Sequence, residues 1–295
     1  MMPRITLQTL TAAAQRNLQA SSAKLAELQQ SATDLKKIPQ ISADPAAAAD
    51  SMAVRAQQAA AAQYARNIAD GTGWLAAADS ALASSTALLQ RAKDLTLQGS
   101  NGATTPAGKE AIAAELDSIR KDLLAQANTQ YLGRSIFAGN SSQGAAYTEG
   151  PLSYTGDPNS TVERRTSANS TIRVDADGSA IFGTSEADSV FGLLATIAAT
   201  LRSGGDVSAQ LTPLDKAANR VADSRSELGA RQGRLLRAQS ANANAVVDLE
   251  NQRSSIEDLD LAKAILDVKT QELAYQAALS VTAKVLQPTL MDFLR

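Results

Sequence analysis

The residues that break helices are confined to limited parts of this chain, and their distribution constrains its fold more than any other feature. All 17 Gly lie between Gly71 and Gly233, and Pro is absent from residues 46–105 and 214–287. Gly and Pro are the residues least compatible with a helix interior. The long segments without them are rich in Ala, Leu, Gln, Lys and Glu. We therefore expect several helices much longer than those of an ordinary globular domain.

The first segment carries apolar residues at a helical spacing. Alternating steps of four and three residues place them on one stripe, which is typical of a helix face that packs against another helix. Thr and Ser interrupt the stripe, and Pro39 ends it. The stripe residues, which are the N-terminal candidates for an assembly seam, are Leu7, Thr11, Ala14, Leu18, Ser21, Leu25, Leu28, Ala32 and Leu35.

A second helix is predicted from Asp44–Pro45 to about Gln98. Asp followed by Pro is the pattern of an N-cap with proline in the first helical turn. The phase of the apolar residues passes through Gly71–Gly73 without a slip, so we expect one continuous helix there; a loop is the alternative. The single Trp is interpreted as a packing anchor. The candidate packing residues of this helix are Trp74, Leu75, Leu82 and Leu89.

A third helix is predicted from Pro106 to about Gly133, after which the chain changes in character. Short runs of Val, Ile, Tyr and Phe, separated by Gly, Pro, Asn and Asp, occupy residues 145–186 and indicate β-hairpins. About 40 residues are too few to form a large core of their own. Arg164 and Arg165 are interpreted as solvated residues at a strand edge.

Helix returns over about Ser189–Arg202, and a long segment with a seven-residue repeat follows it. Asn242 falls on its stripe, where it either fixes the register or faces water. Ser254–Glu257 fits a capping box, which predicts that the last helix begins there, with Glu257, Asp258 and Asp260 as favourable charges in its first turn. The candidate packing residues of the long segment are Leu228, Leu235 and Leu249. The candidate seam of the last helix comprises Leu261, Ile265, Val268, Tyr275, Leu279, Leu286, Leu290 and Phe293.

The order of these elements is symmetric about the β region. We expect a mainly α protein, an elongated rod of long antiparallel helices with a small β insertion at its distal end. A 50-residue helix alone is about 75 Å long. The predicted parts are an N-terminal helix (1–43), central helices (44–144), the β insertion (145–186), returning central helices (187–253) and a C-terminal helix (254–295).

The stripes of the two end segments are poor in large side chains. Many of their positions are Ala, Ser or Thr, which bury little apolar area. The two ends must meet for either stripe to be covered, and the gain is then still small against the entropy of ordering the helices. We therefore expect residues 1–38 and 257–295 to fold fully only when neighbouring subunits cover their other faces, as in a self-assembling component.

The composition excludes several functions. The chain has no Cys and no His, which removes disulfides, the usual zinc sites and every imidazole-dependent catalytic triad. With a net charge of −2 and no long basic run, it is not expected to bind nucleic acid. No apolar run approaches the roughly 20 residues of a membrane span, and the N-terminus lacks the apolar core of a cleaved signal peptide. We expect no cofactor and no membrane association.

One acidic pattern is a candidate metal site. Positions 1, 3, 5 and 12 of a calcium-loop pattern are occupied by Asp175, Asp177, Ser179 and Glu186. Position 6, which needs Gly for its sharp turn, carries Ala180. A β-hairpin turn at Asp177–Gly178 is therefore favoured over calcium binding. No catalytic and no metal-binding residues are predicted.

A set of short motifs runs along nearly the whole chain. They are Met2–Thr6, Asp44–Ala48, Asn67–Ile68, Trp74–Leu75, Asp79–Leu82, Leu89–Ala92, Leu97–Gly99, Ile136–Gly139, Tyr154–Asp157, Gly229–Arg231, Asp260–Ala262, Tyr275–Leu279, Val285–Gln287 and Asp292–Leu294. In this order they resemble the flagellin-like axial proteins of bacterial flagella, and most closely the hook–filament junction branch, hook-associated protein 3. Each motif is modest alone, and the ordered set is specific.

The resemblance implies a structural component of the bacterial flagellum that joins hook to filament and is not an enzyme. It implies export through the flagellar type III channel without a cleaved signal peptide, and a final location outside the cell. The implied partners are further copies of the chain in a ring, hook-associated protein 1, flagellin and a cytoplasmic export chaperone. The terminal helices would line the tube, and the β insertion would project outward.

Three alternatives stay open. The closest is a flagellin or minor filament protein, although Lys36–Ala48 carries Asp44–Pro45 where flagellin usually has a Ser-Gly-x-Arg-Ile-Asn segment. The tail Asp292–Arg295 also suits the junction branch better. A cytoplasmic coiled-coil scaffold is more distant, because long Ala-rich helices with heptads also build such proteins. An enzyme that uses carboxylates is the third.

Overall fold

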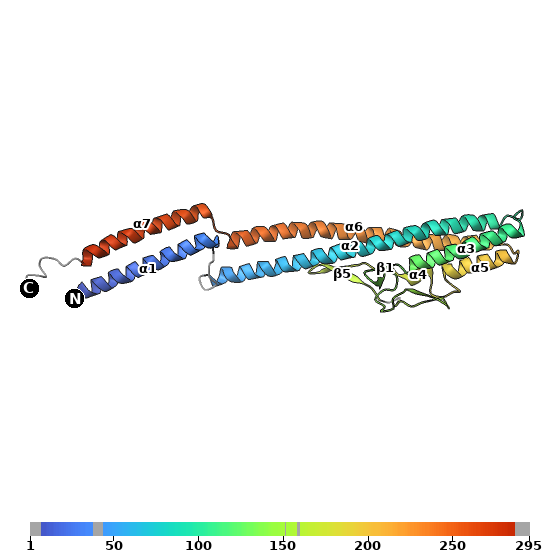
Figure 1. The fold of residues 1–295 in the computed structure, drawn as a ribbon, viewed down its shortest axis with the longest axis horizontal. Helices are drawn as coiled ribbons and strands as arrows, with labels where there is room; N and C mark the ends of the chain where they lie inside the picture. Colours follow the sequence, from blue (N-terminus) through green and yellow to red (C-terminus); the bar gives the residue numbers. More distant parts are fainter. Residues whose placement is uncertain (1–6, 38–43, 151, 158–159, 287–295) are drawn as a thin grey trace, which may run out of the picture. The chain divides into compact units, whose positions relative to one another are not determined.

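The computed structural model describes residues 7–37, 44–150, 152–157 and 160–286. It divides into two compact units, one built from Met1–Ala60 with Val246–Arg295 and the other from Ala61–Ala245. Helices α2 (Pro45–Gly99) and α6 (Leu211–Glu257) contribute residues to both units. The chain is mainly α with long helices and a small β insertion, which confirms the predicted fold class (Figure 1).

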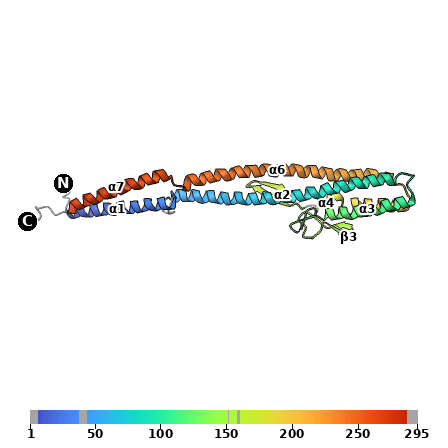
Figure 2. The ribbon, with the colours of Figure 1, turned by 45° about the horizontal axis from the view of Figure 1, so that its top comes forward.

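The first unit is a set of helices with few buried apolar side chains. Helix α1 (Leu7–Asp34) and helix α7 (Leu261–Leu286) lie side by side in both views (Figures 1 and 2). They run antiparallel, because Ser21 meets Gln271 while Leu35 meets Leu259. The start of α2 and the end of α6 complete the unit. Its buried apolar side chains, among the residues described, are Ala48, Val54 and Ala264.

The second unit holds a continuous apolar core. The remainder of α2 and α6 run antiparallel in it, and helices α3 (Pro106–Ala127) and α5 (Val190–Arg202) pack beside each other. The antiparallel order follows from three contacts between α2 and α6: Asn242 Nδ2 donates to Ala61 O at 3.1 Å, Arg225 pairs with Asp79 at 3.0 Å, and Lys93 pairs with Asp215 at 2.6 Å. Asn242 therefore contacts a neighbouring helix and does not simply face water.

The β insertion consists of short two-stranded antiparallel hairpins. The first pairs β1 (Gln130–Tyr131) with β2 (Arg134–Ser135) and begins before the predicted boundary at 145. The second pairs β3 (Tyr147–Glu149) with β4 (Leu152–Tyr154), and the third pairs β5 (Glu163–Ser167) with β6 (Ser170–Arg173). A short helix α4 (Gly178–Phe182) follows. An aromatic cluster stabilises the insertion and its contact with α5: Phe137, Tyr147, Tyr154, Phe182 and Phe191.

The prediction that the second helix continues through Gly71–Gly73 is confirmed. Because both glycines lack a side chain, neighbouring residues approach the α2 backbone closely at these positions. A Cβ atom on Gly71 would meet Val174 Cγ1 at 3.1 Å and Leu235 Cδ1 at 3.3 Å, and one on Gly73 would collide with the Tyr131 hydroxyl. Each glycine lowers the stability of the helix by about 1 kcal/mol, but it allows the insertion to pack closely against α2.

Three local predictions are wrong. The last helix does not begin at the Ser254–Glu257 capping box, because α6 continues to Glu257 and α7 begins at Leu261. The cap is instead Asp260, whose Oδ1 accepts from the Lys263 amide at 3.2 Å. Asp177 does not form a hairpin turn with Gly178. Its carboxylate caps α4 by accepting from the Ser179 amide at 2.9 Å.

The third wrong prediction concerns Arg164. It was expected at a solvated strand edge, but its guanidinium lies 5.6 Å from the ring centroid of Trp74 and its Nε is 2.5 Å from Asp70 Oδ2. The guanidinium of Arg134 lies at the same distance from that ring. Trp74 is buried, as a packing anchor should be, and the two arginines stack on it.

Candidate assembly surface

The most buried side chains between α1 and α7 are small or polar, and larger apolar side chains of both helices are only partly buried. Among the residues that the structure describes, the buried members of this interface are Ser31, Ala264 and Thr282. Near the middle, Gln271 Nε2 donates to the Ser21 carbonyl at 3.1 Å and lies 2.9 Å from the Ser21 hydroxyl. Such side chains let two helices approach closely, but each buries little apolar area. Packing between the two helices therefore removes little apolar area from water.

The predicted N-terminal seam lies on the partly buried face of α1. Ala14, Leu18, Leu25 and Leu28 are all partly buried, whereas Leu35, just beyond the end of the helix, is exposed. Leu7 is the first residue of α1. The heptad spacing therefore follows the face that α1 turns toward its neighbours.

The predicted C-terminal seam lies differently. Val268 and Tyr275 are partly buried, but Leu261, Ile265 and Leu279 are exposed. Leu286 is the last residue of α7, and Leu290 and Phe293 lie outside the described residues. The stripe of bulky residues is thus rotated around α7 away from the stripe that contacts α1. That inner stripe consists of Ala264, Val268, Gln271, Tyr275, Ala278 and Thr282.

Helix α7 consequently exposes an unusual amount of apolar surface. Leu266 and Leu273 are each 68% exposed. The exposed large apolar residues of this helix are Leu261, Ile265, Leu266, Leu273, Leu279 and Val281. Several exposed large apolar side chains on one helix are typical of protein–protein contact sites. In the first unit, α7 is therefore the best candidate for an assembly surface.

The central packing residues lie in the core of the second unit, with one exception. Trp74, Leu75, Leu82, Leu89, Leu228 and Leu235 are buried there. Leu249 belongs to the first unit and is partly buried.

Sequence reasoning missed a polar cluster around Glu257, which is only 8% exposed. Its carboxylate accepts two hydrogen bonds from Arg55, from Nε and Nη2, each at 2.7 Å. It also accepts from the Ser51 hydroxyl at 2.5 Å and from Arg253 Nη1 at 3.3 Å. Hydrogen bonds from Arg55 and Ser51 lower the pKa of Glu257 to about 2. The four-residue spacing of Arg253 and Glu257 was the one visible signal of this cluster.

The connections on either side of this cluster are hydrogen-bonded to each other. Lys36 and Asp258 form an isolated antiparallel bridge. The Lys37 amide donates to the Glu257 carbonyl at 2.8 Å, and the Leu259 amide donates to the Leu35 carbonyl at 3.2 Å. Residues 35–37, after α1, are thus tied to residues 257–259, before α7.

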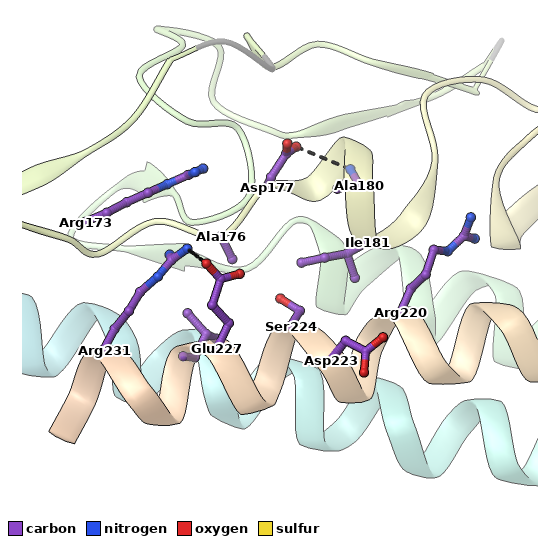
Figure 3. A pocket seen from close by; sticks show the side chains of 11 residues that line it. Arg173, Ala176, Asp177, Ala180, Ile181, Arg220, Asp223, Ser224, Glu227 and Arg231 are labelled. Atoms are coloured by element: carbon purple, nitrogen blue, oxygen red, sulfur yellow. Dashed lines mark hydrogen bonds and ion pairs between the residues drawn. The ribbon is translucent and has the colours of Figure 1, made fainter. Parts of the chain in front are cut away.

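A hollow of about 240 Å³ lies in the second unit between α4 and α6 (Figure 3). Glu227 and Arg231 line it from α6, and Ala180 lines it from α4, with Asp177 at the N-cap of that helix (Figure 3). Its charged lining is balanced, with Arg173, Arg220 and Arg231 against Asp177, Asp223 and Glu227. This balance offers no excess charge to select an anion or a cation.

Arg231 ties the insertion to α6 at this hollow. It is 6% exposed, and its Nη1 donates to the Asp175 carbonyl at 2.6 Å while its Nη2 donates to Glu227 at 2.6 Å. The Asp175 carboxylate is in turn bound by Arg173 and by the Val162 amide. Two acidic groups of the calcium-loop pattern, Asp175 and Asp177, are therefore used within the fold. In the part of the chain that the structure describes, no group of three or more acidic side chains could hold a metal ion.

Burial also raises the pKa of Tyr147, whose hydroxyl donates within the aromatic cluster to the carbonyls of Gly178 and Gly183. It raises the pKa of Tyr154 as well, whose hydroxyl donates to the Phe137 carbonyl. Both phenols are thereby held protonated as structural donors. Across the described helices, no stretch is both long and apolar enough to cross a membrane.

The family comparisons match both ends of the chain. The family described as the bacterial flagellin N-terminal helical region matches residues 5–142, and the one described as the bacterial flagellin C-terminal helical region matches residues 211–294. The two matches together cover well over half of the sequence. The chain belongs to the bacterial flagellin family. Its members are structural components of the flagellum, which is assembled outside the cell.

Two curated relatives illustrate the range within the flagellin family. Flagellar hook-associated protein 3 of Salmonella typhimurium is 27% identical over 287 residues, covering 89% of this chain and 89% of that protein. Flagellin of Listeria monocytogenes is also 27% identical, over 226 residues, covering 75% of this chain and 74% of that protein. The family resemblance expected from the ordered motifs is thus confirmed.

Two solved structures share the fold of this flagellin-family chain. FlgL of Bacillus cereus is 25% identical with a TM-score of 0.58, covering 68% of this chain and 99% of that one. Flagellar hook-associated protein 3 of Legionella pneumophila has a TM-score of 0.62 at 14% identity, covering 69% of this chain and 99% of that one. The second likeness concerns the fold alone.

Proposed function

We propose that this chain is the structural protein that joins the hook to the filament of a bacterial flagellum. The observation that carries the proposal is the extent of the likeness to hook-associated protein 3, which spans 89% of both chains, against about three quarters for the flagellin. The chain acts in this role by assembling in the flagellar axis and carries out no catalysis.

Assembly proceeds by coupled folding of the terminal helices. The most buried side chains of the α1–α7 pair are small or polar, and α7 carries leucines that are 68% exposed. Copies of the chain that surround this pair would remove that apolar surface from water. The proposed partners are further copies in a ring, hook-associated protein 1, flagellin and a cytoplasmic export chaperone. The chain reaches them through the flagellar type III channel.

Hydrogen exchange tests the coupled folding. Backbone amides of α1 and α7 should exchange freely in the dilute monomer and be protected in the assembled axis, while buried parts of α2 such as residues 74–92 stay protected in both. Rigid, protease-resistant α1 and α7 in the monomer would contradict coupled folding.

Deletion of the gene tests the junction role. Electron microscopy should show cells that keep hooks and lack filaments, with flagellin released into the medium. A filament that is unaffected would refute the proposal. Restoration by the plasmid-borne gene is the control for effects on neighbouring genes.

A flagellin or minor filament protein is the second candidate, favoured by the likeness to the Listeria protein. Immunogold labelling of sheared flagella separates the two. A junction protein gives one zone of label between hook and filament, whereas a filament protein gives label along the length. Label found only in the cytosol would instead support a cytoplasmic scaffold.

A further inference from the structure

The interface between α1 and α7 does little by packing to set its own register. The α1 stripe carries small side chains at Ala14 and Ser21 and partly buried leucines at Leu18, Leu25 and Leu28, so the α1 residue that contacts Gln271 is small. On the facing stripe, Ala264 and Ala278 stand one heptad before and after Gln271. A slide of one heptad would place Ser21 opposite an alanine and would cost the bond between Ser21 and Gln271. Side chains of this size do not interlock as large knobs in holes would.

The polar cluster around Glu257, at the end of α6, holds the chain just before α7 in one position, which the small side chains between α1 and α7 do not. The Glu257 side chain binds Ser51 and Arg55 on α2, and its backbone carbonyl accepts from the Lys37 amide. The Glu257 side chain thus holds the end of α6 against α2, while the backbone of residues 257–259 binds the segment that leaves α1. Helix α7 begins four residues after Glu257, at Leu261, so the distance from this cluster to α7 is short.

The chemistry of the cluster suits a specifying role. A buried charge pays a desolvation cost that an apolar side chain would not, so its advantage lies more in selecting one arrangement than in stability. The two parallel bonds from Arg55 also restrict geometry, because a guanidinium fork matches a carboxylate in one orientation. A shifted α7 would have to break these bonds or those of residues 35–37.

We propose that Glu257 is the positioning residue that sets the register of α7 against α1. The register also fixes where the exposed leucines of α7 stand beside α1, and so bears on the assembly proposed above. The inference itself is independent of whether the chain is a junction or a filament protein.

Disulfide trapping in the full-length chain tests the inference, because the sequence contains no Cys and every disulfide is therefore an engineered one. Ser21→Cys is combined with Gln271→Cys for the observed register, or with Ala264→Cys or Ala278→Cys for a shift of one heptad. Rates of disulfide formation under a mild oxidant are read on non-reducing gels. The ratio between pairs is the readout, so it holds whether α1 and α7 pair all or part of the time.

Each pair is measured in three backgrounds. In the native background the Ser21–Gln271 pair should form at least tenfold faster than either shifted pair. In Glu257→Leu that preference should fall below threefold. The matched control is Glu250→Leu, on the same helix, which removes an exposed carboxylate bound to Arg253 and Gln58 and should keep the tenfold preference.

Glu257→Gln, which keeps an oxygen acceptor for Arg55, should show an intermediate preference. A Glu257→Leu chain that keeps the tenfold preference would overturn the proposal. So would equal rates accompanied by loss of helical circular dichroism, because Glu257 would then be needed to form the helices and not to align them. Trp74 fluorescence, which reports on the second unit, should be unchanged in every variant.

Discussion

The two units of this chain use the same secondary structure with opposite means of stabilisation. The second unit encloses Trp74, Leu75, Leu82 and the aromatic cluster of the insertion in one continuous core. The first unit buries small side chains and a charged cluster around Glu257, and leaves the leucines of α7 in water. Long helices therefore do not by themselves imply a filled apolar core.

The difference indicates a division of labour. In a unit with a filled core, apolar burial within one molecule offsets the conformational entropy lost when the chain is ordered. A unit with small and polar interfaces has to obtain part of that burial from other molecules. The unit with the filled core is the one built from Ala61–Ala245, and the unit with little buried apolar area is the one that holds α1 and α7.

The largest effect expected from this comparison concerns one leucine from each unit. Leu82→Ala removes a fully buried side chain from the second unit and should lower the free energy of unfolding by about 2–5 kcal/mol. Leu273→Ala removes a side chain that is 68% exposed, and should change the free energy of unfolding of the monomer by no more than about 0.5 kcal/mol. Urea denaturation followed by circular dichroism measures both.

The order of the two effects should be reversed when incorporation into the flagellar axis is measured in place of monomer stability. Leu273→Ala should weaken incorporation into the flagellar axis, because its side chain belongs to the exposed surface of α7. A Leu273→Ala monomer as unstable as Leu82→Ala would show that α7 is already packed in the isolated chain. The contrast between the two units would then be wrong.

The sequence predicted the helical framework well, for reasons that are local. Helix breakers determine where long helices cannot continue, and Asp44 forms the predicted cap, its Oδ1 accepting from the Ala47 amide at 3.0 Å. The continuity of α2 through Gly71 was predicted from the phase of its neighbours alone. These properties depend on residues a few positions apart, which a single sequence displays directly.

The misses share a different origin. Glu257 was interpreted as a first-turn charge because its partner Arg55 is 202 residues away in the sequence. Arg164 was placed at an open edge for the same reason, since Asp70 and Trp74 come from a distant helix. On α7, the predicted stripe shares Val268 and Tyr275 with the face toward α1, but distant residues of α1 decide that Ala264 and Thr282 are the ones buried there. Long-range pairing decides all three.

A medium effect is expected from pH in the first unit. The pKa of Glu257 is about 2 in the folded chain, below its ordinary value of 4.5, so folding favours the carboxylate. Its contribution to stability is complete above pH 4.5 and is lost as the pH falls toward 2. The unfolding free energies of the native chain and of Glu257→Gln should therefore differ by about 1–3 kcal/mol above pH 5 and converge near pH 2. A difference that does not change with pH would show that the charge of Glu257 has no part in its effect.

The smallest effects should come from ion pairs in the second unit, where the apolar core dominates. Lys93 and Asp215 form a pair whose side chains are about half exposed, so Lys93→Ala should change the free energy of unfolding by no more than about 0.5 kcal/mol. Arg164 differs because it also stacks on Trp74, and Arg164→Ala should cost about 1–2 kcal/mol and shift the emission of that tryptophan. Urea denaturation with fluorescence detection measures both variants. Equal losses of unfolding free energy for Lys93→Ala and Arg164→Ala would mean that stacking on Trp74 adds nothing to the ion pair of Arg164. A charged residue next to the core would then contribute no more to stability than one on the surface.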